Sequence, residues 1–239
     1  MSTTFSSLKT TVTNYLGRSD SDIATRVGEF INLRQKIICR YANFPFLEDI
    51  GTGTCTASDG IYAISDYLPS STATFSDYKE ELRIDLRNTA NNERQSFTKL
   101  TLMEFERAQS FNDLDETGQP THYYVFQKNF YFHPIPDAAY VFILKGYCYL
   151  ADLSANGDHN DLIDNWPEVI IYGAAAEGFN YYEDDVNYQK YEAKYKEALS
   201  EMVKKEFRKK YANVDFGMIP RQGLGDMDST RVNIKAFYE

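Results

Sequence analysis

The amino-acid sequence predicts an α+β protein in which helices from both chain ends pack with a central antiparallel β-sheet or sandwich domain, followed by an extended C-terminal arm. Apolar residues recur at three- and four-residue steps near both ends of the chain, which is the period of an amphipathic helix. The middle contains short alternating runs interrupted by Gly, Asn, Asp and Pro, a pattern typical of antiparallel strands. The chain therefore divides into N-terminal helices, a β domain, C-terminal helices and the arm, at 1–46, 47–150, 151–212 and 213–239.

Two helices are predicted in the N-terminal segment. The first is short and ends near Gly17, a residue that commonly follows the last turn of a helix. The second spans 22–42, and residues on one side of it form a nearly continuous stripe that includes Phe30, Ile31, Arg34 and Ile38. Because the stripe is mostly apolar, we expect this side of the helix to be buried against other helices.

The β domain is predicted from alternation of apolar and polar residues between turn-forming residues. The alternation favours strands at 53–57, 60–65, 81–86, 97–102, 122–127, 130–133 and 139–149. The helical period returns briefly at 103–110, which predicts one helical insertion among the strands. Lys128 and Asn129 stand between two apolar runs and predict a hairpin turn there.

Two further helices are predicted after residue 150. Asp164 or Asn165 is expected to cap the first of them, with Pro167 in its first turn, and the second is expected at 185–211. These C-terminal helices and the N-terminal helix at 22–42 each have one apolar side, so we expect the two groups to pack together. The residues predicted to make this contact are Phe30, Ile31, Ile38, Trp166, Ile170, Tyr191 and Tyr195.

The arm has a strand-like pattern only near its end. Val232, Ile234 and Ala236 alternate with polar residues, and Phe237 and Tyr238 follow. An extended segment of this kind can add a strand to the edge of a partner's sheet, with the aromatic side chains as anchors. We expect the arm to become ordered only when it docks on a partner.

Composition excludes several classes of protein. The formal net charge is −10, which disfavours tight binding to nucleic acid or to anionic lipid. The three cysteines are far apart, which favours reduced thiols over a disulfide framework. A polar N-terminus and the lack of a long apolar run predict a protein without signal peptide or membrane span. The 19 Tyr and 16 Phe against a single Trp are typical of a protein that assembles with partners.

No motif predicts catalysis, a metal site or a cofactor. His122, His133 and His159 do not stand beside a Ser or Cys in a nucleophile motif, and structural or surface roles are favoured for them. The segment 152–158 has oxygen-bearing side chains at the first, third and fifth positions and Gly at the sixth, as a calcium loop has. The twelfth position is Ile163, where such a loop needs Glu, so an ordinary polar loop is favoured.

Four segments, in this order, resemble the head-to-tail adaptor proteins of short-tailed bacteriophages. FINLRQKIICRYANFPFLED and the hairpin GIYAISDYLPSS are similar to the opening of that family. GQPTHYYVFQKNFYFHPIPDAAYVFILKGYCYLADL is similar to its central strands, and NDLIDNWPEVIIYGAAAEGFNYYEDDVNYQKYEAKYKEAL to its paired C-terminal helices. The resemblance covers most of residues 20–212 and leaves the arm unmatched.

The resemblance implies a structural virion protein of the neck or tail, assembled in the host cytoplasm, rather than an enzyme. It implies a ring of about twelve subunits that binds the portal protein, extends the DNA channel and presents a platform for downstream tail or nozzle proteins. Duplex DNA would pass without specific binding, so we expect an acidic or neutral lining, with the lysines and arginine of 204–210 away from it. The arm would dock on the portal or on a neighbouring subunit. Two alternatives remain: another ring component, such as a tail-tube or head-completion protein, and a carbohydrate-binding or hydrolysing protein.

Overall fold

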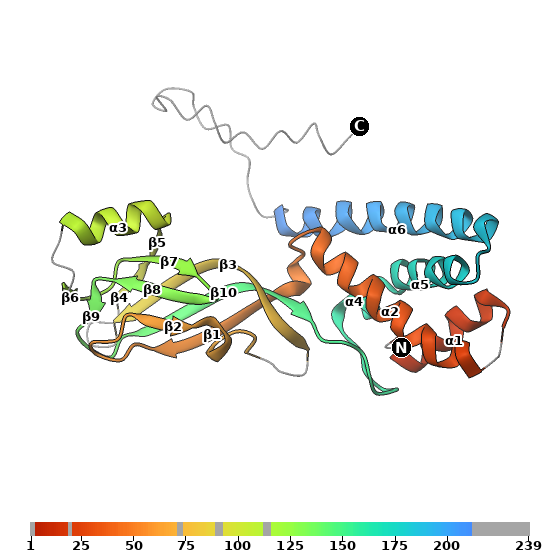
Figure 1. The fold of residues 1–239 in the computed structure, drawn as a ribbon, viewed down its shortest axis with the longest axis horizontal. Helices are drawn as coiled ribbons and strands as arrows, with labels where there is room; N and C mark the ends of the chain where they lie inside the picture. The colour runs from red at the N-terminus through yellow and green to blue at the C-terminus, as the bar shows by residue number, and fades with distance from the viewer. Residues whose placement is uncertain (1–2, 19–20, 71–73, 89–92, 112–115, 212–239) are drawn as a thin grey trace, which may run out of the picture.

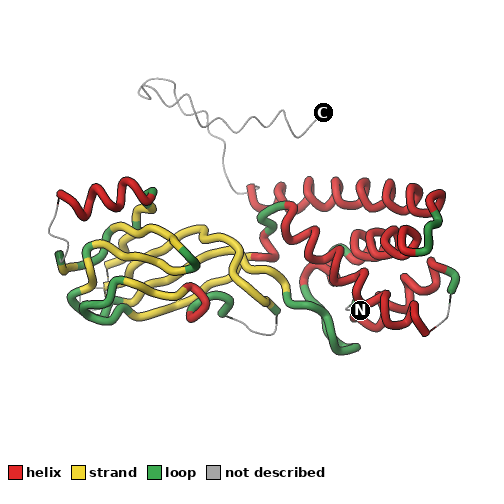
Figure 2. The backbone as a smooth tube through the Cα atoms, viewed as in Figure 1, coloured by secondary structure: helices red, strands yellow, loops and turns green. Residues whose placement is uncertain are grey.

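The computed structural model describes residues 3–18, 21–70, 74–88, 93–111 and 116–211, which form an elongated molecule with two lobes (Figure 1). The helical lobe contains α1 (Phe5–Leu16), α2 (Ser21–Tyr41), α4 (Asp161–Asn165), α5 (Pro167–Tyr181) and α6 (Asp185–Tyr211). The other lobe is a β-sandwich that carries α3 (Leu102–Phe111) on its surface. Figure 2 shows the separation of the two classes of secondary structure, and the predicted α+β fold class is confirmed.

The helical lobe is formed by segments from the two ends of the chain. α1 starts with a capping box between Thr4 and Ser7, and it ends at Gly17, whose left-handed backbone (φ 64°) satisfies the last carbonyl groups. α5 contacts α1, α2 and α6, so it is the central helix of the lobe. Gly178 makes this packing possible, because a Cβ there would lie 2.7 Å from a methyl carbon of Leu16.

The sandwich consists of two four-stranded sheets and a small third pair. The long sheet has the order β1 (Glu48–Thr54), β10 (Val141–Leu150), β3 (Phe75–Asn88) and β4 (Glu93–Ser96). The short sheet has the order β2 (Ile61–Ala63), β8 (Asn129–His133), β7 (His122–Phe126) and β5 (Thr98–Lys99). The third pair is β6 (Thr117–Gly118) with β9 (Ile135–Pro136). All pairings are antiparallel except β5 with β7 and β6 with β9.

An aromatic core fills the space between the long and short sheets. Phe142 of the long sheet lies 5.5 Å from Phe132 and 5.7 Å from Tyr62 of the short sheet, between ring centroids. Gly53 lies beside this cluster, and a Cβ there would approach the Phe142 ring to 2.3 Å. The glycine in β1 is therefore required by the aromatic packing.

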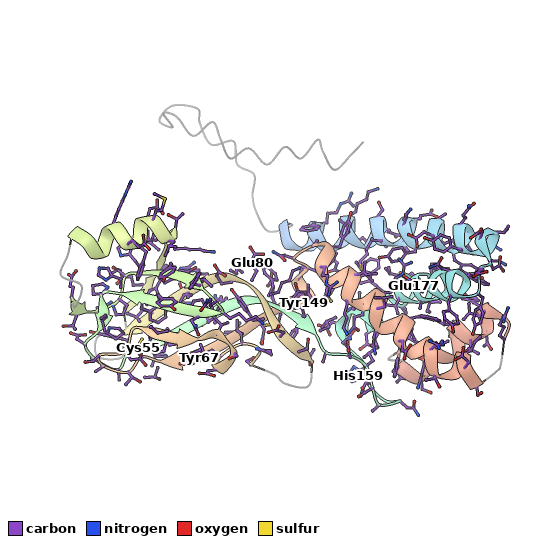
Figure 3. All side chains as sticks on the ribbon, in the orientation of Figure 1. Cys55, Tyr67, Glu80, Tyr149, His159 and Glu177 are labelled. Carbon is purple, nitrogen blue, oxygen red and sulfur yellow. The ribbon has the colours of Figure 1, made fainter. Side chains whose placement is uncertain are left out.

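Hydrogen bonds and a short connecting turn help to join the two lobes. Lys79 of β3 donates hydrogen bonds to the carbonyl oxygens of Cys39 and Ala42 at the C-terminal end of α2 (2.6 and 2.9 Å). A cation suits this position, because the C-terminal end of a helix is the negative end of its dipole. Next to it, Asn43 donates to Glu80 of β3, which lies at the boundary between the lobes (Figure 3). The 3-10 turn η1 (Pro45–Leu47) then leads directly from α2 into β1.

Several sequence predictions of local structure were wrong. The first strand is β1, which begins five residues before the predicted 53–57, and the strand predicted at 60–65 is only β2, because the 3-10 turn η2 (Ile64–Asp66) ends it. β3 is much longer than predicted, and β4 was not predicted. The hairpin turn lies at Gln127 and Lys128, which have positive φ, rather than at Lys128 and Asn129. The predicted cap is also wrong: Asn160 caps α4, and α5 starts after Trp166 without a side-chain cap.

Candidate assembly surfaces

The helical lobe contains a buried cation between two acidic side chains. The Arg34 guanidinium on α2 lies 3.0 Å from a carboxylate oxygen of Glu177 on α5 and 2.9 Å from one of Glu192 on α6. All three side chains are largely buried, and Glu177 lies among the helices of this lobe (Figure 3). The guanidinium also lies over the Tyr195 ring, 4.6 Å from its centroid. One side chain thus links three helices.

Hydrogen bonds connect α2 to the segment that follows β10. Asn32 donates to the carbonyl of Leu153 (3.0 Å) and accepts from its backbone N–H (2.9 Å). Gln35 donates to the carbonyl of Ala151 (2.8 Å) and accepts from the side chain of Asn160 (2.9 Å). Gln35 and Asn160 are buried and Asn32 is half-buried, and their hydrogen bonds fix the path of the chain from the sandwich back into the helical lobe.

The side chains predicted to join the two groups of helices lie in this lobe. Ile31 and Ile38 on α2 and Ile170 on α5 are fully buried, and Tyr195 is nearly so. Trp166 is buried and donates its indole N–H to Glu206 (2.9 Å) on α6. Phe30 and Tyr191 are half-buried against the same cluster. The predicted contact residues of the arm, Val232, Ile234, Ala236, Phe237 and Tyr238, lie outside the described residues.

The ion pairs of Arg34 were not predicted. Arg34 was placed in the apolar stripe of α2, and a charged residue in such a stripe signals a buried partner. Glu177 gives the same signal on α5, because it stands among small and apolar residues. The sequence does not tell which acid meets which base, because that depends on how the helices cross.

The outer face of the long sheet carries a group of cations around a buried acid; we call it the cationic face. In register across the strands, it includes Ile50, Thr52 and Thr54 of β1, Val141, Ile143 and Lys145 of β10, Arg83, Asp85 and Arg87 of β3, and Arg94 and Ser96 of β4. The Asp85 side chain is only 1% exposed, whereas those of Arg83 and Arg94 are 55% and 51% exposed.

Asp85 holds two of these arginines in place. Desolvation by burial favours a raised pKa for Asp85, but hydrogen bonds from Arg94, Ser96 and Arg83 outweigh it and lower the pKa below its ordinary value. The carboxylate therefore stays ionised, and it fixes the guanidinium groups of Arg83 and Arg94 on the surface of the sheet. The sequence alternation Arg83, Asp85, Arg87 could have predicted this face, since alternate residues of a strand point the same way.

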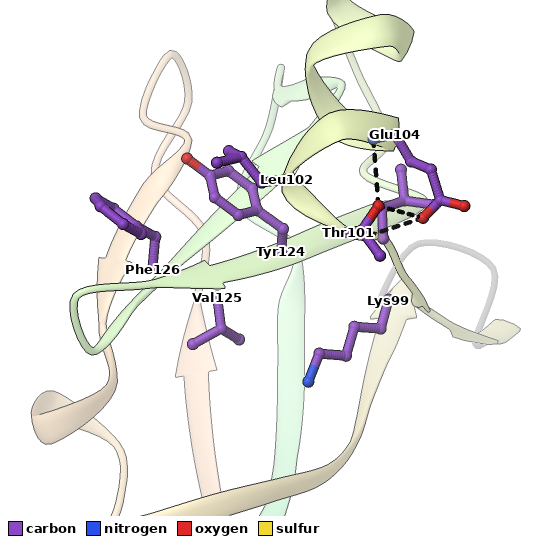
Figure 4. Close-up of a pocket in the computed structure, with 8 residues that line it drawn as sticks. Lys99, Thr101, Leu102, Glu104, Tyr124, Val125 and Phe126 are labelled. Atoms are coloured by element: carbon purple, nitrogen blue, oxygen red, sulfur yellow. Dashed lines mark hydrogen bonds between the residues drawn. The ribbon is translucent and has the colours of Figure 1, made fainter.

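The outer face of the short sheet is aromatic and apolar; we call it the aromatic face. Ile61 of β2, Tyr131 of β8 and Tyr124 of β7 lie in register, with the two tyrosine rings stacked at 4.6 Å between centroids. Phe126 and the start of α3 extend this face through Leu102, which lies beside Tyr124 and Phe126 and is 47% exposed. Figure 4 shows Tyr124, Phe126 and Leu102 on one side of β7 and Val125 on the other.

The described residues contain no group of three His, Cys, Asp or Glu that could hold a metal ion. In the polar loop at 152–158, Asp158 accepts hydrogen bonds from the backbone N–H groups of Ser154 and Ala155 (both 2.7 Å), and Asp152 pairs with Lys36. These carboxylates thus have partners within the protein. His133 is buried beside Glu116, and burial lowers its pKa.

A comparison with known protein families gives a match over nearly the whole chain. The model of the SU10 adaptor proteins matches residues 3–215. The chain belongs to the SU10 adaptor protein family. This family is one of bacteriophage adaptor proteins, which are structural rather than enzymatic, and its members belong to the neck of the virion. No described helix is both long enough and apolar enough to cross a membrane. A search of curated proteins found no match.

Proposed function

We propose that the chain is the ring subunit of a head-to-tail adaptor. In this proposal about twelve copies form a ring that binds the portal protein, extends the DNA channel and gives downstream tail proteins a platform. The observation that carries the proposal is the adaptor-family match over residues 3–215. The buried ion pairs between helices and the hydrogen bonds between lobes support it, since a subunit that acts by geometry must hold its surfaces at fixed positions.

The charge of the chain supports a conduit through which DNA slides. A ring of twelve copies at −10 each would carry about −120 formal charges, and an acidic or neutral lining has no cations to retain phosphates. We expect the cations of 204–210 to lie away from the lumen. Lys205 already pairs with Glu201 on the surface of α6. Assembly in the host cytoplasm and a place in the neck are part of the same proposal.

The arm at 213–239 is proposed to dock on the portal or on a neighbouring subunit. Its composition favours ordering only on a partner, since Gly, Pro and Asp disfavour a regular helix. Deleting 213–239 should leave a folded protein that loses portal binding or ring stability. Unchanged assembly of the truncated protein would show that the arm has no such role.

Native mass spectrometry of the full chain, with and without purified portal, tests the central proposal. We expect a closed ring that binds the portal but not tail-tube subunits. A ring that binds tail-tube subunits instead would assign the chain to the tail tube. A chain that stays monomeric in both conditions would overturn the proposed function.

A further inference from the structure

The cationic and aromatic faces lie on opposite sides of the same sandwich. The inner sides of the two sheets meet at the Phe142 cluster, so the outer sides point away from each other. Two different surfaces on opposite sides of a subunit are what a head-to-tail contact between identical copies requires, and such contacts close into rings. We propose that, in the ring proposed above, the cationic face of each copy packs on the aromatic face of the next.

The chemistry of the two faces is complementary. Guanidinium groups stack favourably on tyrosine and phenylalanine rings. Arg83 and Arg94 are held by Asp85 with about half of each side chain exposed, so little conformational entropy is lost when a ring covers them. On the other side, Tyr124 and Tyr131 are stacked and half-buried; the Phe105 ring of α3 packs on Tyr124, so Tyr131 is the ring that α3 leaves for an arginine of the next copy. Arginine and aromatic residues are enriched where proteins meet.

The apolar parts of the two faces also match. Ile50 is 57% exposed on the cationic face, with Ile143 half-buried beside it. On the aromatic face, Ile61 and Phe126 are about as exposed as Ile50. Burying these side chains against each other removes apolar surface from water, which is the main driving force of association. The exposed carboxylate of Glu104 on α3 borders the aromatic face and gives the arginines of the next copy an opposite charge.

Other occupants fit the cationic face less well. Two cationic faces packed on each other would bring Arg83, Arg94 and Lys145 of both copies together, which like-charge repulsion opposes. Duplex DNA on this face would contact Ile50 and Ile143, whose side chains cannot bind phosphates. The net charge of −10 also repels DNA from the chain at a distance. The aromatic face of a second copy matches both the cations and the apolar residues.

Paired substitutions on each face test the contact. The first variant, Ile50→Asp with Thr52→Asp, places acids on the cationic face without changing Asp85 or its partners. The second, Ile61→Asp with Phe126→Asp, places acids on the aromatic face. The matched control is Leu33→Asp with Val186→Asp, which changes exposed apolar residues of the helical lobe (46% and 78% exposed). Far-ultraviolet circular dichroism checks that each variant is folded.

Sedimentation and native mass spectrometry then read the assembly state. We expect rings from the wild-type chain and the control, and monomers from each face variant alone. Each face variant keeps one intact face, and these two faces are complementary, so mixing the variants should give a 1:1 heterodimer that grows no further.

Three results would overturn the contact while leaving the proposed ring intact. The first is ring formation by both face variants, and the second is a homodimer formed by either face variant alone. The third is that the control variant also fails to form rings. Rings from the cationic-face variant that have lost a duplex-DNA affinity seen with the wild type would assign that face to DNA instead. A wild-type chain that is monomeric with and without portal would instead refute the proposed function itself.

Discussion

Removing the cation that links the three long helices should strongly destabilise the helical lobe. In Arg34→Met the alkyl part of the side chain is largely kept, but Glu177 and Glu192 lose their shared partner. These carboxylates are only 20% and 17% exposed, so water cannot replace the guanidinium. Breaking a buried ion pair from one side costs about 3–5 kcal/mol, because a charge is left unpaired in a poorly solvated site. We expect a loss of that size in the free energy of unfolding.

Urea unfolding followed by tryptophan fluorescence measures this loss in the right part of the molecule. Trp166 is the only tryptophan, and it is buried in the helical lobe against α6, so its emission reports that lobe. The matched control is Lys36→Met on the same helix. It breaks the exposed ion pair between Lys36 and Asp152 and should lower the free energy of unfolding by about 0–1 kcal/mol. If Arg34→Met costs no more than Lys36→Met, the buried ion pairs do not stabilise the lobe and the reasoning fails.

Three further predictions concern packing, thiols and pH. Gly173→Ala should destabilise the protein by about 1–3 kcal/mol in the same assay, because the added Cβ would lie 3.0 Å from the Arg34 and Tyr195 side chains. A gain in stability would mean that these two side chains move easily. A thiol reagent should react with the native protein only very slowly and with three thiols after denaturation, because burial raises the pKa of Cys39 and Cys55 to about 11 and that of Cys148 to about 12. Because the pKa of Asp85 is lowered in the folded state, its contribution to stability is present above the ordinary carboxyl pKa of about 4 and is lost as the pH falls through the lower folded value. Asp85→Asn should therefore unfold with a shallower pH dependence in acid, and an unchanged acid profile would contradict this assignment.

The order of helices and strands could be predicted where side chains carry the pattern. The helices at both ends have one apolar side, and β7, β8 and β10 alternate or are rich in aromatic residues, so their period is visible. Most of β1 lies before the predicted strand, because it contains Gly51 and Gly53, which are poor strand formers on their own. Its pairing with β10 and the aromatic rings packed on it determine that conformation, and neither is local in sequence.

The surfaces were less predictable than the fold, because they depend on register. Four strands drawn from residues 48–150 meet in the cationic face, and a shift of one residue in β3, β4 or β10 would point the cations of that strand into the sandwich. The β10 and β3 register even shifts next to Arg83, between Lys145 and Gly146. No alternation within one strand reveals which residues of the next strand lie beside it.

The connection between the lobes determines how a contact between neighbouring sandwiches would position the helical lobes of a ring. β3 and β10 pair along most of their length and reach the helical lobe, where Lys79 binds the last carbonyl groups of α2 and Gln35 binds the carbonyl of Ala151. Because buried and charge-assisted hydrogen bonds resist bending, each sandwich and its helices should turn as one unit. A face-to-face contact between neighbouring sandwiches would then set the spacing and tilt of every helical lobe, even where the helices of neighbouring copies do not touch.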